Sequence, residues 1–174
     1  SLPMGGVLVL FSIYNRLDTV ILQALKGSSE VGIYGLSYRI YEVLILGAFY
    51  LTNSLFPILA KEKDQLYFRK IYQKTVDVLI MGGLTVFLGT LFFAPLAIKV
   101  VAFKRAAEFS QSVSLLQILG LATIFSYLNH LTGSAIIILG KQRKYLLISF
   151  SALIFNLVTN LLLIPQYSFY AAAW

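Results

Sequence analysis

Of the 174 residues in the chain, 59% are hydrophobic and only 12% are charged, whereas soluble domains are about 45–50% apolar and about 25% charged. This composition excludes an ordinary soluble domain and indicates a membrane protein. The absence of Cys excludes disulfides and thiolate metal sites, and one His among scattered acidic residues predicts no metal site. The formal net charge is +7, but Lys and Arg lie mainly in two loops between apolar stretches, which indicates membrane lipids rather than nucleic acid as partners.

Five apolar stretches are long enough to cross a bilayer whose hydrocarbon core is about 30 Å thick. The sequence therefore predicts an all-α membrane protein, a bundle with five transmembrane helices over residues 4–25, 31–57, 74–97, 111–139 and 145–164. Residues 171–174 predict the start of a sixth helix. Turn and stop signals follow the spans at Gly27-Ser28-Ser29, Pro57, Gly140 and Pro165.

The segment 58–74, between the second and third spans, mixes charged residues with a few apolar ones. It is either an interfacial helix lying on the membrane surface or an ordinary solvated connector, and the pattern favours neither. No basic region precedes the first apolar stretch, and the chain stops as a helix begins. We therefore expect residues 1–174 to be one bundle of a longer transporter, without its native termini.

The loop charges predict an orientation. The second-to-third and fourth-to-fifth loops share one side of the membrane, and together they carry eight cations: Lys61, Lys63, Arg69, Lys70, Lys74, Lys141, Arg143 and Lys144. The opposite side carries four: Lys26, Lys99, Lys104 and Arg105. The side with eight cations is predicted to be cytoplasmic, so the chain enters its first span from the cytoplasm.

The first span holds ionisable residues near the middle of the membrane. Arg16 and Asp18 lie about 18–21 Å along a helix that begins at Met4. Because a charge at this depth costs roughly 2.5–3.5 kcal/mol, such residues usually face a protein interior or a wet cavity. At about 100° per residue, Arg16 shares one polar stripe with Ser12, Asn15, Thr19 and Gln23. We expect this stripe to line a cavity.

Asp18 lies off the polar stripe and is expected to meet a different neighbour. It is predicted either to pair with a cation on another helix or to carry a coupling ion, such as a proton or sodium. Its position off the stripe favours the ion pair.

The later spans contain further polar sets. In the second span, Tyr34, Tyr38 and Tyr41 share one face, and Arg39 and Glu42 are spaced for an intrahelical ion pair. In the fourth span, His130 is either a proton-coupling residue or, as is commoner, a hydrogen-bond donor between helices. In the fifth span, Asn156, Thr159 and Asn160 are interpreted as interhelical hydrogen-bonding residues. The sequence contains no phosphate loop, nucleophile motif or metal-binding helix, so no enzyme is predicted.

Three short motifs resemble a known family. Arg16-Leu17-Asp18-Thr19, the run Glu30-Val31-Gly32-Ile33-Tyr34, and Phe56-Pro57 together resemble the Wzx-type O-antigen and polysaccharide repeat-unit flippases, within the multidrug/oligosaccharidyl-lipid/polysaccharide exporter superfamily. Leu163-Ile164-Pro165-Gln166-Tyr167 agrees with the family pattern, but Ser168 and Ala171 stand where that pattern has glycines. The resemblance covers the whole chain and corresponds to the seventh to eleventh helices and the lead into the twelfth.

The resemblance implies half of a two-bundle, V-shaped transporter in the cytoplasmic membrane of a bacterium or archaeon. It implies export of an undecaprenyl-pyrophosphate-linked oligosaccharide for surface polysaccharide or lipopolysaccharide synthesis, with the missing first bundle and membrane lipids as partners. No cofactor is implied, apart from coupling to a proton or sodium gradient. The alternative is a cation-coupled multidrug exporter of the same superfamily.

The candidate residues divide into two groups. Residues predicted to contact the substrate in a cavity are Arg16, Asn15, Thr19, Gln23, Arg39, Tyr34, Tyr38 and Tyr41. Residues predicted to carry a coupling ion or form an ion pair are Asp18, Glu42 and His130.

Overall fold

A computed structural model of the chain describes residues 17–173. These residues form an all-α membrane protein, as the composition predicts. Residues 17–26 are helical. They are followed by α2 (Ser28–Lys61), α3 (Gln65–Ala102), the 3₁₀ turn η1 (Phe103–Arg105), α4 (Gln111–Ile138), α5 (Gln142–Tyr167) and α6 (Phe169–Ala173). Helices α2, α3, α4 and α5 are each long and apolar enough to cross a membrane. The predicted span 4–25 lies mostly outside the described residues.

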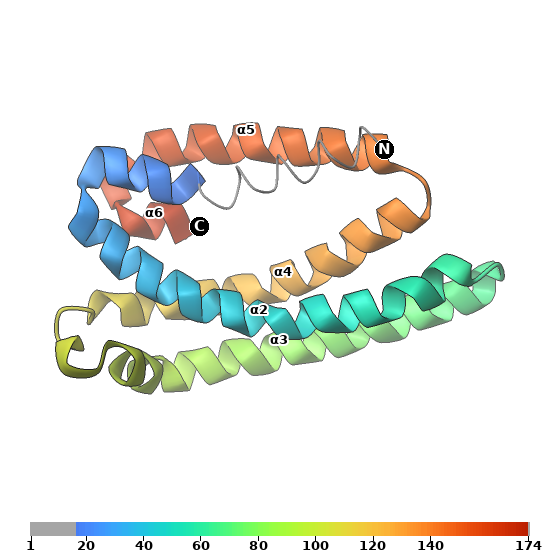
Figure 1. Cartoon of the computed structure of the whole chain (residues 1–174), viewed down its shortest axis with the longest axis horizontal. Helices are drawn as coiled ribbons and strands as arrows, with labels where there is room; N and C mark the ends of the chain where they lie inside the picture. The colour runs from blue at the N-terminus through green and yellow to red at the C-terminus, as the bar shows by residue number, and fades with distance from the viewer. Residues whose placement is uncertain (1–16, 174) are drawn as a thin grey trace.

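The helices form two groups. Figure 1 shows α2 and α3 as a long antiparallel hairpin with α4 against it, whereas α5 runs apart from them on the opposite side. Residues 17–26 and α6 lie between α5 and the beginning of α2. Helix α4 packs against both α2 and α3. The short helix α6 therefore connects α5 to the group formed by α2, α3 and α4.

Close packing of α3 against α4 depends on small residues. A Cβ atom on Gly120 of α4 would lie only 1.9 Å from Oγ1 of Thr90 on α3. One on Gly83 of α3 would lie 3.0 Å from the Cα of Ile124. Because lipid tails are as apolar as Leu, transmembrane helices associate through such close backbone approach and through hydrogen bonds.

Helices α2 and α4 exchange two serine hydrogen bonds at their buried contact. Ser37 Oγ donates to the carbonyl oxygen of Ser112 at 2.9 Å, and Ser112 Oγ donates to the carbonyl oxygen of Ile33 at 2.9 Å. Both serine side chains are completely buried. Each hydroxyl thus finds a partner on the opposite helix, which is what a buried polar group in a membrane requires.

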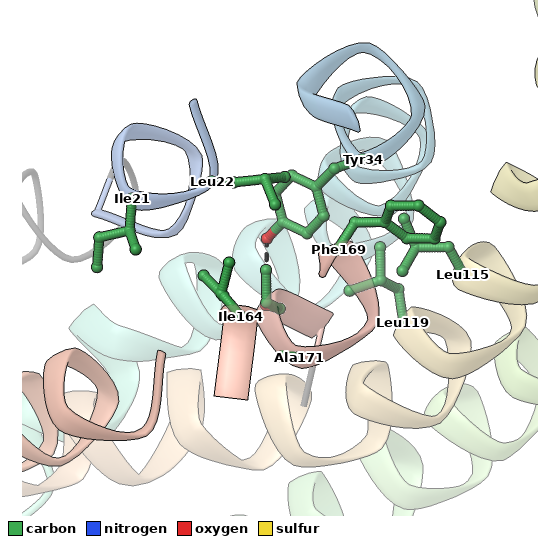
Figure 2. Close-up of a cluster of buried hydrophobic side chains, with 9 residues drawn as sticks. Ile21, Leu22, Tyr34, Leu115, Leu119, Ile164, Phe169 and Ala171 are labelled. Carbon is green, nitrogen blue, oxygen red and sulfur yellow. Dashed lines mark hydrogen bonds between the residues drawn. The ribbon is translucent and has the colours of Figure 1, made fainter. Parts of the chain in front are cut away.

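The largest apolar cluster lies where the two groups meet. Figure 2 shows Leu22 from the 17–26 helix beside the Tyr34 ring from α2, and Ile21 from the same helix belongs to the same cluster. The other members come from α4, α5 and α6: Leu115, Leu119, Ile164, Phe169, Ala171 and Ala172. The Tyr34 hydroxyl donates a 3.4 Å hydrogen bond to the carbonyl oxygen of Ala172. This cluster fixes α6 against the helices that precede it.

Pro57 and Pro165 are predicted by the sequence to end their helices, but neither does. Pro57 lies inside α2, which continues to Lys61, and Pro165 lies inside α5, which continues to Tyr167. A proline removes one backbone hydrogen bond, but transmembrane helices tolerate this when the surroundings compensate. After Pro57, Leu59 is buried and holds the last turn. After Pro165 the last turn of α5 is capped, since Lys26 Nζ donates to the Pro165 carbonyl oxygen at 2.9 Å.

The segment 58–74 is neither a separate interfacial helix nor a connector. It contains the end of α2, three non-helical residues at 62–64, and the beginning of α3. Asp64 starts α3, because its side chain accepts a 2.8 Å hydrogen bond from the backbone N–H of Leu66. The apolar residues Phe68 and Tyr72 stack with ring centroids 6.4 Å apart, and Tyr72 packs against a buried cluster of α2, α3 and α4 residues.

Two glycines mark helix ends as the sequence predicts. Gly140 has φ of 70°, and the N–H of Lys141 bonds the carbonyl oxygen of Ile136 while that of Gly140 bonds Ile137, which is a Schellman termination of α4. Gly27 has φ of 88° and separates the first helix from α2, but Ser28 already begins α2. The predicted turn at 27–29 is therefore limited to Gly27.

Candidate functional site

The Asp18 carboxylate lies inside the bundle and faces α5. Its Oδ1 accepts a 2.6 Å hydrogen bond from Nδ2 of Asn160, and the same Nδ2 donates to Oδ1 of Asn156 at 3.0 Å. Asn156 and Tyr34 also direct hydrogen-bonding groups at the carboxylate. Asp18 is half-buried and Asn160 is 3% exposed. We call Asp18, Asn156 and Asn160 the carboxylate–amide cluster.

The favoured expectation that Asp18 forms an ion pair does not hold within residues 17–173. Across that range the single ion pair joins Arg105 to Glu108. The physical reason is local, because the helix that faces Asp18 presents two asparagines at one-turn spacing instead of Lys or Arg. The expectation that Asp18 meets a neighbour away from the polar stripe is correct.

A row of tyrosines on α2 continues from the carboxylate–amide cluster into the bundle. The rings of Tyr34 and Tyr38 stack with centroids 5.4 Å apart, and those of Tyr38 and Tyr41 lie 5.6 Å apart. The Tyr41 hydroxyl lies 2.5 Å from the Ser126 hydroxyl on α4. Tyr34 is only 2% exposed, whereas Tyr38 and Tyr41 are half-buried. In this conformation Tyr34 supports the bundle, and Tyr38 and Tyr41 retain exposed ring surface.

Two members of the polar stripe of the first helix, Thr19 and Gln23, lie among the described residues. Gln23 is exposed and its amide Nε2 donates to Ser28 Oγ at 3.1 Å, while Thr19 is half-buried. Asn15 and Arg16, the two central members of the stripe, lie outside the described residues. On the same helix Ile21 and Leu22 are buried, so the helix faces the bundle with its apolar residues and Asp18.

Arg39 and Glu42 lie on the exposed side of α2. Both side chains are exposed, and within the described residues neither takes part in an ion pair, so the predicted intrahelical pair is not formed. They lie roughly 12 Å and 17 Å along the span predicted to begin at Val31, which is membrane depth. Because a charged residue at that depth avoids hydrocarbon, this side of α2 requires a polar surrounding beyond the described bundle.

His130 lies apart from the carboxylate–amide cluster. It is half-buried on α4, and its ring meets the Phe49 ring of α2 edge-on, with centroids 5.9 Å apart. Ser126, one helical turn earlier, is bonded to Tyr41. The structure therefore places His130 at the α2–α4 contact, one turn beyond the last tyrosine of the row.

Sequence reasoning identified each asparagine but missed their partner. Asn156 and Asn160 were interpreted as hydrogen-bonding residues, yet nothing in the spacing of residues so far apart links them to Asp18. The 2.8 Å contact between the hydroxyls of Ser114 and Tyr170 was also missed. Both contacts join residues far apart in the sequence, which only the packing of the helices brings together.

The oxygen atoms of the carboxylate–amide cluster are ligands that suit a hard monovalent cation or a proton. A carboxylate with amide oxygens offers oxygen ligands, which alkali and alkaline-earth cations prefer over nitrogen or sulfur. Over residues 17–173, no group of three or more His, Cys, Asp and Glu side chains gathers to hold a metal ion.

Comparison with known proteins gives the family. The chain is 26% identical over 168 residues to an uncharacterized membrane protein of Methanocaldococcus jannaschii, an alignment that covers 96% of this chain and 39% of the relative. The chain thus spans about two fifths of the length of that curated relative. No solved structure matches. Residues 3–162 match the MatE family, whose members are membrane transporters. From this match over most of its length, the chain belongs to the MatE family.

Proposed function

We propose that this chain is one bundle of an exporter that moves a lipid-linked oligosaccharide across the cytoplasmic membrane of a bacterium or archaeon. The observation that supports it most is the exposed side of α2, where Arg39 lies at membrane depth without an ion-pair partner among the described residues. Arginine binds pyrophosphate through a planar, bidentate fork. Arg16, which lies outside the described residues, provides a second candidate cation.

The substrate requires two properties of such a site. Its pyrophosphate head needs cations in a wet cavity, and its polyprenyl tail must stay in the bilayer. Exposed Arg39 and Glu42 at mid-membrane depth favour a wet surface on this bundle, completed by a second bundle of the full-length protein. Tyr38 and Tyr41 offer partly exposed rings that can stack on sugar faces.

The carboxylate–amide cluster supports cation coupling and keeps a second function in view. An acidic side chain held by two asparagines, with no cation partner in the described part of the chain, can bind a proton or sodium ion. In an oligosaccharide exporter this ion would drive the return step. In a cation-coupled multidrug exporter the same carboxylate would bind the ion or the cationic drug.

Replacement of Arg39 tests the proposed substrate. Arg39→Ala in the full-length protein should abolish surface polysaccharide and leave lipid-linked oligosaccharide on the inner leaflet, because the pyrophosphate loses a cation in low dielectric. Arg39→Lys should restore part of the export, since only the bidentate fork is lost. Arg143→Ala, which removes an exposed cation from the first turn of α5, is the matched control and should export normally. Arg16→Ala should behave as Arg39→Ala does.

A parallel measurement separates the two functions. The wild-type protein, expressed in a host that lacks its own multidrug exporters, should leave drug susceptibility unchanged. Increased resistance to cationic drugs, together with normal polysaccharide in the Arg39→Ala strain, would replace the oligosaccharide proposal with the multidrug one.

A further inference from the structure

The hairpin of α2 and α3 is longer than a bilayer requires. Its helices contain 34 and 38 residues, so they measure about 51 Å and 57 Å, against a hydrocarbon core of about 30 Å. Figure 1 shows the closed end of this hairpin reaching past the end of α4. Leu59 is the last buried residue of α2 and Thr75 is the first of α3. We call residues 60–74 the hairpin tip.

The hairpin tip carries five exposed cations. These are Lys61, Lys63, Arg69, Lys70 and Lys74. Within the described residues none of the five forms an ion pair. The carboxylates nearby are occupied by other donors: Glu62 accepts from the N–H of Asp64, Asp64 accepts from the N–H of Leu66, and Asp77 accepts from the Gln73 amide, at 2.8, 2.8 and 3.1 Å.

At the opposite end of α3, one cation has a carboxylate partner in the chain. There Arg105 pairs with Glu108 at 2.6 Å, and the hydrogen bond from this guanidinium holds the pKa of Glu108 below its ordinary value. The Arg105 guanidinium also lies 6.0 Å from the centroid of the Phe109 ring. Arg105 is thus neutralised by its own chain, which leaves Lys99 and Lys104 as the two cations of this end without an ion pair among the described residues, against five at the hairpin tip.

The position of the tip cations matches the headgroup layer of a bilayer. Lys74 begins the predicted third span, and Lys70 and Arg69 lie roughly 6 Å and 8 Å beyond it. The headgroup region adds about 5–7 Å on each side of the hydrocarbon core. Tyr67, exposed on the same helix, is a residue type typical of the membrane–water interface. Because loop charge predicts the cytoplasmic side, the facing leaflet is the one that carries anionic lipids.

We propose that the hairpin tip binds the headgroups of anionic phospholipids, with Arg69, Lys70 and Lys74 as the contacting cations. The three occupy the solvent-facing side of the first turns of α3, while Phe68 and Tyr72 on the opposite side are half-buried. The bound lipids would fix the depth of the α2–α3 hairpin in the membrane. This inference stands independently of the exported substrate.

Lipid retention by two matched triple variants tests the proposal. The full-length protein in detergent is mixed with equal phosphatidylglycerol and phosphatidylcholine, and bound lipids are counted by native mass spectrometry. Wild type should retain phosphatidylglycerol preferentially. R69Q/K70Q/K74Q should lower this preference about tenfold or more, since each cation near an anionic surface strengthens binding several-fold. K99Q/K104Q/R105Q removes three exposed cations from the opposite end and should keep the preference.

Two further measurements distinguish a loss of lipid binding from a folding defect. The charge-conserving variant R69K/K70R/K74R should bind as wild type does, and 1 M salt should remove the preference of the wild type, because the contacts are exposed. Equal preference in wild type and R69Q/K70Q/K74Q, or equal loss in both triple variants, overturns the proposal. A wild type without any preference overturns it too and directs attention to an acidic protein as the partner of the tip.

Discussion

At the residue scale, the structure gives single side chains one set of neighbours where the sequence allows several. Asp18 is the main example, because its hydrogen bond to Asn160 replaces the cation partner that its depth in the membrane suggested. Ser168 is a second example. It stands where the related pattern has glycine, and the chain still makes the turn between α5 and α6 there, with Ser168 at φ of 52°.

Replacement of Asp18 tests cation coupling. Asp18→Asn should leave protein abundance near the wild-type level, because neutralising the carboxylate strands no cation in the described bundle and the asparagine oxygen can still accept from Asn160. Export should then lose its dependence on a proton or sodium gradient. Abundance and ion dependence are measured in the same strain. A sharp fall in abundance would instead reveal a cation partner, whose stranding costs roughly 3–5 kcal/mol.

Replacement of Ser168 should stabilise the protein. A left-handed backbone costs a non-glycine residue about 1–2 kcal/mol, and the buried Ser168 hydroxyl oxygen has no hydrogen-bond partner within residues 17–173, so Ser168→Gly relieves both penalties. The midpoint of thermal unfolding in detergent, followed by circular dichroism, should rise by a few degrees. Ser151→Gly, in the middle of α5, is the control and should lower it. A lower midpoint for Ser168→Gly would contradict the expected strain.

At the element scale, α3 and α4 are joined by close backbone approach and α2 and α4 by the two exchanged serine hydrogen bonds. These contacts combine three helices into a single unit. Helix α5 contacts that unit through α4 and through α6, and it is held to the 17–26 helix by the Lys26–Pro165 bond and the carboxylate–amide cluster. The position of α5 therefore depends on a few polar contacts near one end.

Replacement of Gly120 tests the α3–α4 contact. Gly120→Ala places a methyl group 1.9 Å from Thr90 Oγ1 and 2.8 Å from Thr90 Cβ, so the helices must separate, at a cost of roughly 1–3 kcal/mol. Gly89→Ala is the matched control, because a Cβ there meets nothing within 4 Å. The unfolding midpoint should fall for Gly120→Ala alone. Equal midpoints for the two variants would show that α3 and α4 can move apart without cost.

At the scale of the whole molecule, an all-α membrane bundle presents two kinds of surface. Large apolar side chains such as Phe92, Phe125 and Phe155 are exposed as lipid-facing residues must be. The exposed side of α2 with Arg39 and Glu42 is the exception. A transporter of two bundles needs such a side on each bundle, turned toward the other.

Cysteine labelling tests the predicted orientation of the whole bundle. The chain has no Cys, so a single cysteine at Lys63 or Arg143 is the only target in these residues. Both positions lie on the side with eight cations and should react with a membrane-impermeant thiol reagent only after the inner membrane is opened. A cysteine at Lys104, on the opposite side, should react while the inner membrane is intact, when the reagent can reach the outer surface of that membrane. The reverse labelling pattern would invert the topology.

The sequence by itself determines the fold class and most helix ends of this protein. Runs of apolar residues long enough to span a bilayer predict helices there, since a backbone in hydrocarbon must satisfy its own hydrogen bonds. Gly140 predicts the end of α4, because a left-handed residue is needed to close it. Such features depend on neighbouring residues along the chain, which a sequence displays directly.

Only the tertiary structure decided where the helices continue and which polar residues meet. Prolines locally favour a helix end, yet α2 and α5 continue past Pro57 and Pro165, and tertiary contacts hold their last turns through burial of Leu59 and the Lys26–Pro165 bond. Asp18 and Asn160 are 142 residues apart, and they meet because α5 packs beside the helix of residues 17–26. The physical reason is that helix propensity and hydropathy are local, whereas packing between distant helices sets the partners of a buried charge.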